Sequence, residues 1–320
     1  MRRIGSWMPV AIALAAFTYV GILDARQCRA DEEETAPAPP ADEQQANVLG
    51  TPEPQDDKPN KGRISLVLES DFTTAYFFRG ILQERNGFIW QPFAEIGFNL
   101  YEGGDDSALK SIDLGFGIWN SFHSNQTLAE SGPANLYETD YYPSLSLTFP
   151  HDVSFSMTYF VYTSPNGAFS TVQNFDMGLA YDDSELWGGG FSMGPSITVS
   201  FETDNTNFGD DTRGSWLGLN AAPTVVAFEG DAYPLTLALP LALGLSISDY
   251  YKVPGEGDDT FGFFSFGLSA SVPLAFIPTD YGSWSANAGV NVLVLGDNLK
   301  EANLGDEVFP VGLGGIRMEY

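Results

Sequence analysis

Apolar residues recur at every second position in short segments from Arg63 to the C-terminus. Successive side chains of a β-strand point to opposite faces, so this alternation indicates strands with one apolar and one polar face. No helical period of comparable length competes. We count twelve such segments, an even number, over residues 64–72, 88–100, 112–119, 144–149, 153–161, 174–181, 191–202, 217–225, 234–248, 264–272, 284–294 and 308–320.

The segment Pro234–Ser248 shows the pattern most clearly, with leucines on one face and small or polar residues on the other. It is too short for a transmembrane helix, which needs about 20 apolar residues, and Pro240 and Gly244 disfavour a helix interior. We therefore expect one strand whose leucine face points at lipid in a closed barrel, where every backbone group is paired. The alternative is a secreted β-sandwich that buries the same leucines between two sheets.

The connections between these segments alternate in length along most of the chain. Residues 150–152, 182–188 and 229–233 form short turns, whereas the intervening connections are long and polar, as at 121–136 and 249–259. Short turns on one side and long loops on the other are typical of outer-membrane barrels. The connections 101–110 and 273–282 are longer than this pattern predicts. We predict an all-β fold, an antiparallel up-and-down transmembrane β-barrel of about 12 strands.

The C-terminal segment carries a separate signal. Gly315, Met318 and the terminal Tyr320 have the spacing glycine-x-x-apolar-x-aromatic. This resembles the terminal strand recognised by the bacterial barrel-assembly machinery, which we expect as a partner through the strand ending at Tyr320. A sandwich leaves this signal and the loop pattern unexplained.

The first 62 residues have a different composition from the rest. Arg2 and Arg3 precede an apolar run and a small-x-small site ending at Ala30, which predicts a signal peptide over residues 1–30. An uncleaved anchor helix is the alternative, and a lipoprotein site at Cys28 is disfavoured by the residues before it. Residues 31–62 are rich in proline and acids, which predicts a disordered periplasmic spacer. The barrel is expected over residues 63–320.

Charge and cysteine content exclude several classes of protein. The formal net charge of −28 argues against nucleic-acid binding and against docking on an anionic membrane surface. Cleavage after Ala30 would remove Cys28, the chain's single cysteine, so the mature chain would carry no disulfide. We expect no cofactor.

Three stretches resemble a bacterial family of outer-membrane barrels of unknown function. Ser70–Phe72 followed by Phe78–Gln83 resembles that family's first-strand signature, Ser-Asp-aromatic and then Phe-Arg-Gly-Ile-x-Gln. Tyr137–Tyr142 and Tyr159–Pro165 resemble two of its later strands. Residues Thr73–Phe77 are extra relative to the family pattern. The resemblance implies a barrel in the outer membrane, with Arg79 on the first strand, and implies no activity.

Strand parity predicts which polar and aromatic residues face the barrel interior. Acids dominate this set, so a lumen lined by them should favour cations, while its aromatic residues could stack on rings of a solute. An equally open alternative is a salt-bridged plug, in which Arg79 is a counter-ion for Glu69, Asp71 or Glu95. The predicted lumen-lining residues are Asp71, Arg79, Glu95, Asp113, Trp119, Glu138, Asp140, Tyr142, Tyr162, Asp176, Glu202 and Trp216.

Enzymatic chemistry is poorly supported by the sequence, and we expect a protein that is not an enzyme. His123, predicted in a long loop, and His151, in a tight turn, should lie at opposite ends of the barrel. His123-Ser124 could be a base beside a nucleophile, but adjacent side chains on an extended chain point apart. Two acid-rich loops, Asp204–Asp211 and Gly255–Asp259, are candidates for weak Ca²⁺ binding without EF-hand spacing.

These expectations combine into one predicted function. We predict a narrow porin-like channel for small neutral or cationic solutes, in the outer membrane of a Gram-negative-type bacterium. The alternative is a non-conducting structural or surface-interaction barrel with acidic, cation-binding loops. A third hypothesis, a lipid-modifying enzyme that uses His123, remains to be separated from both.

Overall fold

The computed structural model describes residues 63–104, 106–187, 190–208, 212–228, 233–253 and 257–320. The predicted signal peptide and spacer, residues 1–62, lie outside the described residues.

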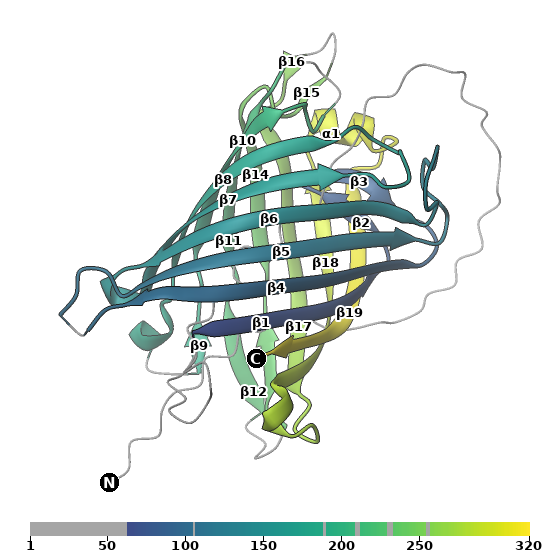
Figure 1. Cartoon of the computed structure of the whole chain (residues 1–320). Helices are drawn as coiled ribbons and strands as arrows, with labels where there is room; N and C mark the ends of the chain where they lie inside the picture. Colours follow the sequence, from purple (N-terminus) through teal and green to yellow (C-terminus); the bar gives the residue numbers. More distant parts are fainter. Residues whose placement is uncertain (1–62, 105, 188–189, 209–211, 229–232, 254–256) are drawn as a thin grey trace.

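Twelve antiparallel strands form a closed barrel, which Figure 1 shows from the side. Each of these strands pairs with the next one along the chain, and β1 pairs with β19 to close the ring. The predicted up-and-down barrel of twelve strands is therefore confirmed. The barrel strands are β1 (Ile64–Thr73), β4 (Ile89–Glu102), β5 (Ser111–His123), β6 (Leu136–Thr148), β7 (Val153–Thr163), β8 (Val172–Tyr181), β10 (Ser196–Asp204), β11 (Ser215–Ala221), β14 (Leu241–Ser248), β17 (Phe261–Pro273), β18 (Ser283–Leu295) and β19 (Val308–Glu319).

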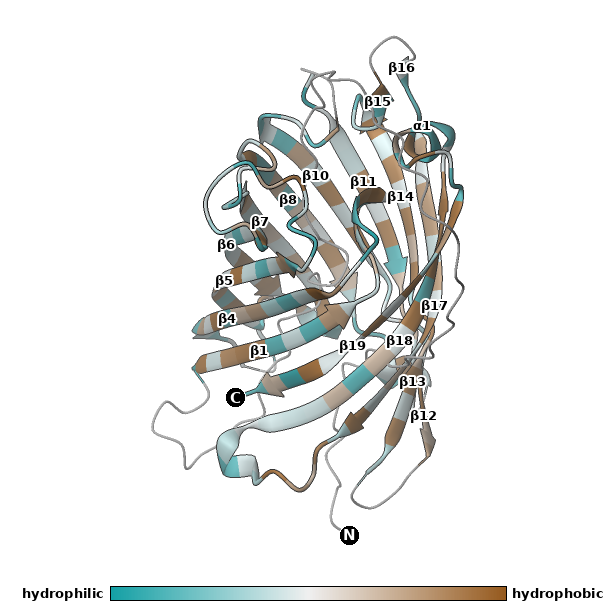
Figure 2. Cartoon of the chain, turned by 90° about the vertical axis from the view of Figure 1, so that its right-hand side faces the viewer, coloured by the Kyte–Doolittle hydropathy of each residue, from teal (hydrophilic) through white to brown (hydrophobic). Residues whose placement is uncertain are grey.

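Apolar and polar residues alternate along the barrel strands, as the bands of colour in Figure 2 show. On β8, for example, Leu179 is 48% exposed on the outer face, whereas Asp176 is 5% exposed on the inner face. The outer surface is therefore apolar, and the polar residues of the strands line the interior.

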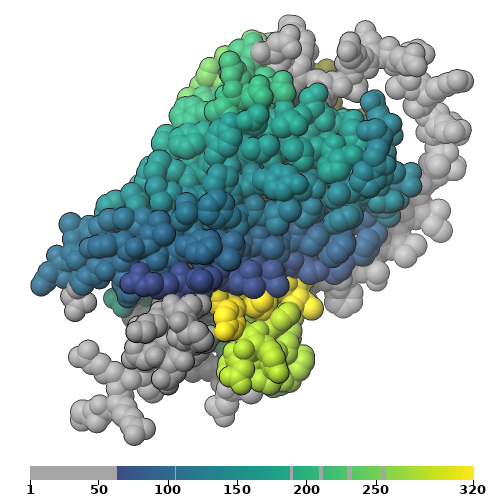
Figure 3. Space-filling view, in the orientation of Figure 1, coloured from purple at the N-terminus to yellow at the C-terminus, as the bar shows by residue number. Residues whose placement is uncertain are grey.

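The two ends of the barrel differ. At the terminal end, where Arg63 and Tyr320 lie, the connections include the 3₁₀ turns η1 (Pro150–Asp152), η2 (Ser184–Trp187) and η3 (Thr279–Tyr281). In Figure 3 the connection between β17 and β18, in yellow-green, projects beyond the wall at this end. The opposite, loop end carries β15 (Lys252–Val253), β16 (Gly257–Asp258) and the short helix α1 (Asp297–Ala302). Within the described ranges, no helix is long and apolar enough to cross a membrane, a result that does not bear on strands.

Prolines interrupt three neighbouring strands at one level of the wall. On the terminal side of Pro195, Pro223 and Pro240 lie the short strands β9 (Phe191–Ser192), β12 (Thr224–Phe228) and β13 (Leu235–Ala238), in which β12 pairs with both β9 and β13. The prediction of one continuous strand over 234–248 was wrong in this detail. Proline has no N–H to donate to the ladder, so β13 and β14 separate at Pro240 although both pair with β17.

The connection between β1 and β4 does not project outward. It forms a small hairpin, β2 (Tyr76–Phe78) and β3 (Ile81–Glu84), whose tip residues Arg79 and Gly80 have φ of +44° and +83°. Phe78 and Arg79 are 0% and 1% exposed because this hairpin lies inside the barrel. We call residues 74–84 the plug hairpin. The expectation that Arg79 belongs to the first barrel strand was wrong, since the extra residues noted in the sequence allow the chain to turn inward.

Candidate functional site

The hydrophobic core of the protein lies inside the barrel, toward the loop end. Phe78 of the plug hairpin packs among residues of the wall and of the loops, including Tyr162, Trp216, Tyr251 and Phe263, each no more than 3% exposed. These side chains come from β7, β11, β17 and the connection after β14, so the cluster joins the plug hairpin to several sides of the barrel.

Arg79 lies at the centre of this cluster. Its Nη2 is 2.8 Å from Oδ2 of Asp176 on β8, and its Nη1 donates a hydrogen bond of 3.2 Å to the phenol oxygen of Tyr250. The guanidinium carbon is 4.3 Å from the ring centre of Trp216 on β11. The sequence had suggested Glu69, Asp71 or Glu95 as counter-ion. Asp176 takes that role because the hairpin carries Arg79 away from β1 and across the lumen.

Side chains of the loop end also hold the backbone of the hairpin tip. The Tyr251 hydroxyl donates to the carbonyl of Arg79 at 2.9 Å, and Asn303 Nδ2 donates to the carbonyl of Gly80 at 2.7 Å. Asn303 Oδ1 in turn accepts from the backbone N–H of Leu82 at 3.0 Å. The connections after β14 and after α1 thus fix the tip in place.

A second contact joins the hairpin to β6. The hydroxyl of Tyr76 donates to Oε2 of Glu138 at 2.8 Å, and Glu138 is 0% exposed. Asp140, two residues further on the same inner face, is 2% exposed and is paired across the strands with Trp119 and Tyr162.

A chain of hydrogen bonds ties the base of the hairpin to the wall. The Thr127 hydroxyl donates to Oε2 of Glu84 at 2.6 Å, so its oxygen accepts from Nδ1 of His123 at 2.8 Å. Nε2 of His123 is then the acceptor for the Ser121 hydroxyl, also at 2.8 Å. His123 was expected in a loop beside Ser124, but it is the last residue of β5 and is 1% exposed.

Ser121, which is 0% exposed, replaces Ser124 as the partner of His123. Ser124 Oγ instead accepts from the backbone N–H of Phe88 at 2.8 Å. The chain from Glu84 to Ser121 has the order of a catalytic relay, but Tyr76 and Tyr137 cover the imidazole, and Tyr137 is stacked at 4.4 Å. His151, in η1, lies at the opposite end of the barrel.

The predicted acids on β1, β4 and β5 differ in their surroundings. Glu69 forms an ion pair with Arg317 of β19, and Asp71 on the same strand is partly exposed. Glu95 is 6% exposed, and Asp113 accepts from Asn99 Nδ2 at 2.8 Å. In the described strands and plug hairpin, the inward-facing basic side chains are those of Arg79 and Arg317, so acids outnumber bases.

The remaining predicted residues, Tyr142 and Glu202, contact the barrel wall and a loop, respectively. The ring of Tyr142 lies over Gly117, where a Cβ atom would be 2.0 Å from Cζ of the tyrosine. Glu202 accepts from the backbone N–H groups of Asn207 and Gly214, each at 2.5 Å, so it braces the connection between β10 and β11.

A patch of small inward-facing residues extends below the core toward the terminal end. They lie on the adjacent strands β6, β7, β8 and β10 and are directly paired across them. Each is partly exposed although it faces inward, so solvent reaches the wall at this level. The residues are Ser144, Ser156, Thr158, Gly178 and Thr198.

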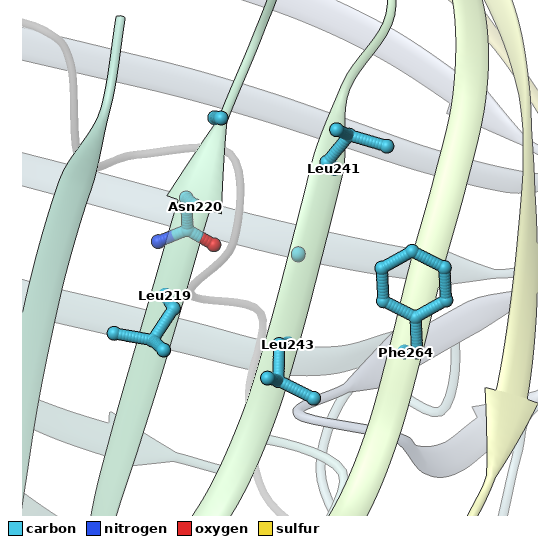
Figure 4. Close-up of a pocket in the computed structure, with 7 residues that line it drawn as sticks. Leu219, Asn220, Leu241, Leu243 and Phe264 are labelled. Atoms are coloured by element: carbon cyan, nitrogen blue, oxygen red, sulfur yellow. The ribbon is translucent and has the colours of Figure 1, made fainter.

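Figure 4 shows a shallow apolar hollow on the outer surface of the barrel, at the level of the proline interruptions. Leu219, Leu241, Leu243 and Phe264 stand out from β11, β14 and β17 around it. Leu219 and Phe264 are 36% and 39% exposed. Apart from Asn220, its lining has no polar side chain, so it offers no groups for catalysis.

Within the described part of the chain, no group of three or more His, Cys, Asp or Glu residues could hold a metal ion. Parts of both acid-rich loops, residues 209–211 and 254–256, lie outside the described residues. Asp258 faces its own loop, since its carboxylate accepts from Ser246 Oγ at 2.7 Å and from the N–H groups of Asp249 and Tyr251.

Comparisons with known proteins give only distant similarities. No protein-family model matches the chain, and a search among curated proteins finds no relative. The family resemblance of the first-strand signature therefore stays a prediction.

Among solved structures, an outer membrane channel from Pseudomonas putida F1 is similar, at 11% identity and a TM-score of 0.46, over 80% of this chain and 94% of that one. The NanC porin is similar at 10% identity and a TM-score of 0.41, over 79% of this chain and 98% of that one. The β domain of the Bordetella autotransporter BrkA has 8% identity and a TM-score of 0.38, over 80% and 98%. Likeness at this level supports no argument about function.

Sequence reasoning missed the residues that come from loops. Tyr250 and Tyr251 lie in a connection that was expected to be acidic and solvated, yet they are 1% and 0% exposed. Two adjacent aromatic residues between polar stretches were a usable signal, because such rings contribute a large apolar area when they are buried. Nothing in the local sequence indicates that Thr127 and Asn303 contact the hairpin.

Proposed function

We propose that the chain is an outer-membrane β-barrel of a Gram-negative-type bacterium and that its lumen is a narrow channel for small neutral or cationic solutes. The structure then corresponds to a closed state, in which the plug hairpin occupies the loop end of the lumen. The observation that carries this proposal is the excess of acidic over basic side chains among the inward-facing residues of the described strands, beside a partly exposed patch of small residues below the hairpin.

The outer surface supports a place in a membrane. Large apolar side chains cover the outer face of the strands, and aromatic residues gather at both ends, as in the girdles of transmembrane barrels. At the terminal end Trp187, Phe276 and Tyr281 are 54%, 71% and 67% exposed, and at the loop end Phe72 and Phe88 are 42% and 57% exposed. Long loops opposite the termini fit the usual orientation, with the termini in the periplasm.

The interior supports passage of neutral or cationic rather than anionic solutes. Glu95 and Asp113 face the interior from β4 and β5, and the inward positions between them, Gly97 and Gly115, carry no side chain. Acidic side chains around a pore attract cations and repel anions. The plug hairpin is a connection between two strands, so it could leave the lumen without breaking any of the pairing of the barrel.

Single-channel recording in a planar bilayer tests this proposal. Discrete conductance steps, with a reversal potential in a KCl gradient that indicates preference for K⁺, are expected. Glu95→Gln and Asp113→Asn should each reduce that preference, whereas Glu307→Gln, at an exposed loop residue paired with Lys300, should leave it unchanged. A conducting but anion-selective protein would contradict the assignment of solute charge.

The packed core favours a second candidate, a non-conducting barrel whose loops bind cations or a partner. Phe78, Tyr162, Tyr251 and Phe263 are each 0% exposed, as in a permanent core. Protein that is inserted and heat-modifiable but passes no current under any condition would favour this candidate.

Assembly of the barrel is expected to depend on its last strand. β19 pairs with both β18 and β1, so it forms the seam at which the ring closes. Recognition of the strand ending at Tyr320 by the barrel-assembly machinery remains a prediction. Removal of Tyr320 should slow assembly in cells without altering the folded barrel, and normal assembly of that variant would contradict it.

A further inference from the structure

The surroundings of Arg79 are those of a ligand in a binding site. Asp176 contacts one terminal nitrogen and the hydroxyl of Tyr250 the other, at 2.8 and 3.2 Å. The guanidinium carbon lies 4.3 Å from the ring centre of Trp216 and 5.6 Å from that of Tyr250. A flat cation thus lies against an aromatic face while its edge meets a carboxylate.

The groups that contact Arg79 belong mostly to the barrel rather than to the hairpin. Asp176 and Trp216 lie on barrel strands, where pairing on both sides fixes the backbone. A Cβ atom at Gly218 would be 2.4 Å from the indole of Trp216, so the glycine provides the space in which the ring lies. Trp216 Nε1 also donates to the Tyr251 hydroxyl at 2.8 Å. When the hairpin leaves, these groups remain.

The arrangement suits a guanidinium group better than an ammonium group. Guanidinium is planar and weakly hydrated, so it can stack on an indole while donating hydrogen bonds in its own plane. Arg79 makes both kinds of contact, since its guanidinium face lies over Trp216 and its edge contacts Asp176 and Tyr250. An ammonium ion is compact and strongly hydrated and would use only the carboxylate well.

A structural latch would not require this charge. The hairpin is also held by neutral donors, with Asn303 and Tyr251 on its tip. Burying a charged pair is costly, and a buried ion pair is weak evidence for stability. The carboxylate and the aromatic face around the Arg79 guanidinium therefore suit the binding of a cation that comes and goes.

We propose that the pocket formed by Asp176, Trp216 and Tyr250 binds the guanidinium group of a small organic solute, and that Arg79 occupies it while the lumen is closed. This inference names a solute class for the channel proposed above and rests on that function. A solute entering from the loop end would compete with Arg79 and so favour displacement of the hairpin.

Binding can be measured without any current. In Arg79→Ala the pocket loses its occupant, and isothermal titration calorimetry in detergent micelles should detect ethylguanidinium, at least tenfold tighter than the neutral N-ethylurea. Adding Asp176→Asn should weaken ethylguanidinium binding at least tenfold. Arg85→Ala is the matched control, because Arg85 forms an exposed pair with Asp306 in the same region and should create no site.

Transport by the unmodified protein gives a second measurement that needs no variant. Proteoliposomes should take up arginine amide faster than lysine amide, which has the same net charge but an ammonium group in place of the guanidinium, and with saturation. Equal uptake of the two amides, or equal binding of ethylguanidinium and N-ethylurea by folded Arg79→Ala protein, would overturn the inference while leaving the channel intact. Selective binding without uptake of any solute would support the site and overturn the channel.

Discussion

Removing the side chain of Arg79 should open the barrel. In Arg79→Ala the closed state retains Asp176, 5% exposed, without its cationic partner. Loss of one member of a buried ion pair costs about 3–5 kcal/mol. In the open state the pair is already broken and water reaches the carboxylate, so this cost falls on the closed state alone.

The magnitude follows from the free-energy difference. Since about 1.4 kcal/mol corresponds to a tenfold change in an equilibrium constant, about 3–5 kcal/mol shifts the ratio of open to closed protein by two to three and a half orders of magnitude. Single-channel recording measures this ratio as the open probability. Adding Asp176→Asn to Arg79→Ala removes the uncompensated charge and should return much of the closed population.

Arg85→Ala removes an exposed guanidinium near the hairpin, and surface pairs contribute at most about 1 kcal/mol, so its open probability should stay near that of the unmodified protein. If folded Arg79→Ala has the same open probability as Arg85→Ala, Arg79 does not hold the hairpin in the lumen. Strictly additive effects of Arg79→Ala and Asp176→Asn would also refute the reasoning.

Three further changes test other parts of the structure. Gly80→Ala should loosen the hairpin tip, because the φ of Gly80 is +83° and a Cβ atom there would be 2.6 Å from Cδ1 of Leu299. The expected result is faster proteolysis within residues 74–88, and an unchanged rate would count against this geometry of the tip. Leu243→Arg should destabilise the barrel in lipid by about 2–4 kcal/mol, as a charge on the lipid-facing side of a barrel does. Leu243→Phe is the control, and equal midpoints of urea unfolding for these two variants would mean that this face does not contact lipid. At Asp183 burial raises the pKa, but hydrogen bonds from Trp187 and two backbone N–H groups outweigh burial and hold the pKa below its ordinary value of 3.8. The Asp183 carboxylate thus stabilises the fold above about pH 4, and this stabilisation is lost as the pH falls through the lowered pKa. Asp183→Asn should therefore lower the free energy of unfolding by about 1.5–3 kcal/mol at pH 7 and by much less at pH 2. An equal loss of stability at both pH values would contradict this.

The barrel itself could be predicted because its determinants are local. Alternation along a segment such as 174–181 sets which side chains face inward, and the same parity holds in β8. Closure of an even number of antiparallel strands then follows from the need to pair every backbone group in lipid. The proline interruptions could be foreseen in position, but not that the chain would resume the ladder beyond Pro240.

The site could be predicted only in part, because its contacts are long-range. Parity correctly placed Asp176 and Trp216 on inward-facing positions. It could not indicate that residues 74–84 turn inward, because a connection between strands carries no periodic signal. The pairing of Arg79 with Asp176 joins residues 97 positions apart, and the sequence provides no measure of that proximity.

Deleting the plug hairpin tests the central claim most directly. A variant in which a short Gly-Ser linker replaces residues 74–84 keeps all twelve barrel strands, and heat modifiability on gels can verify that it folds. We predict that planar-bilayer recording of this variant will show stable, cation-selective steps, whereas the unmodified protein will be closed most of the time. A folded variant that passes no current would contradict the claim that the hairpin closes a channel, as would steps of the same size and duration in both proteins.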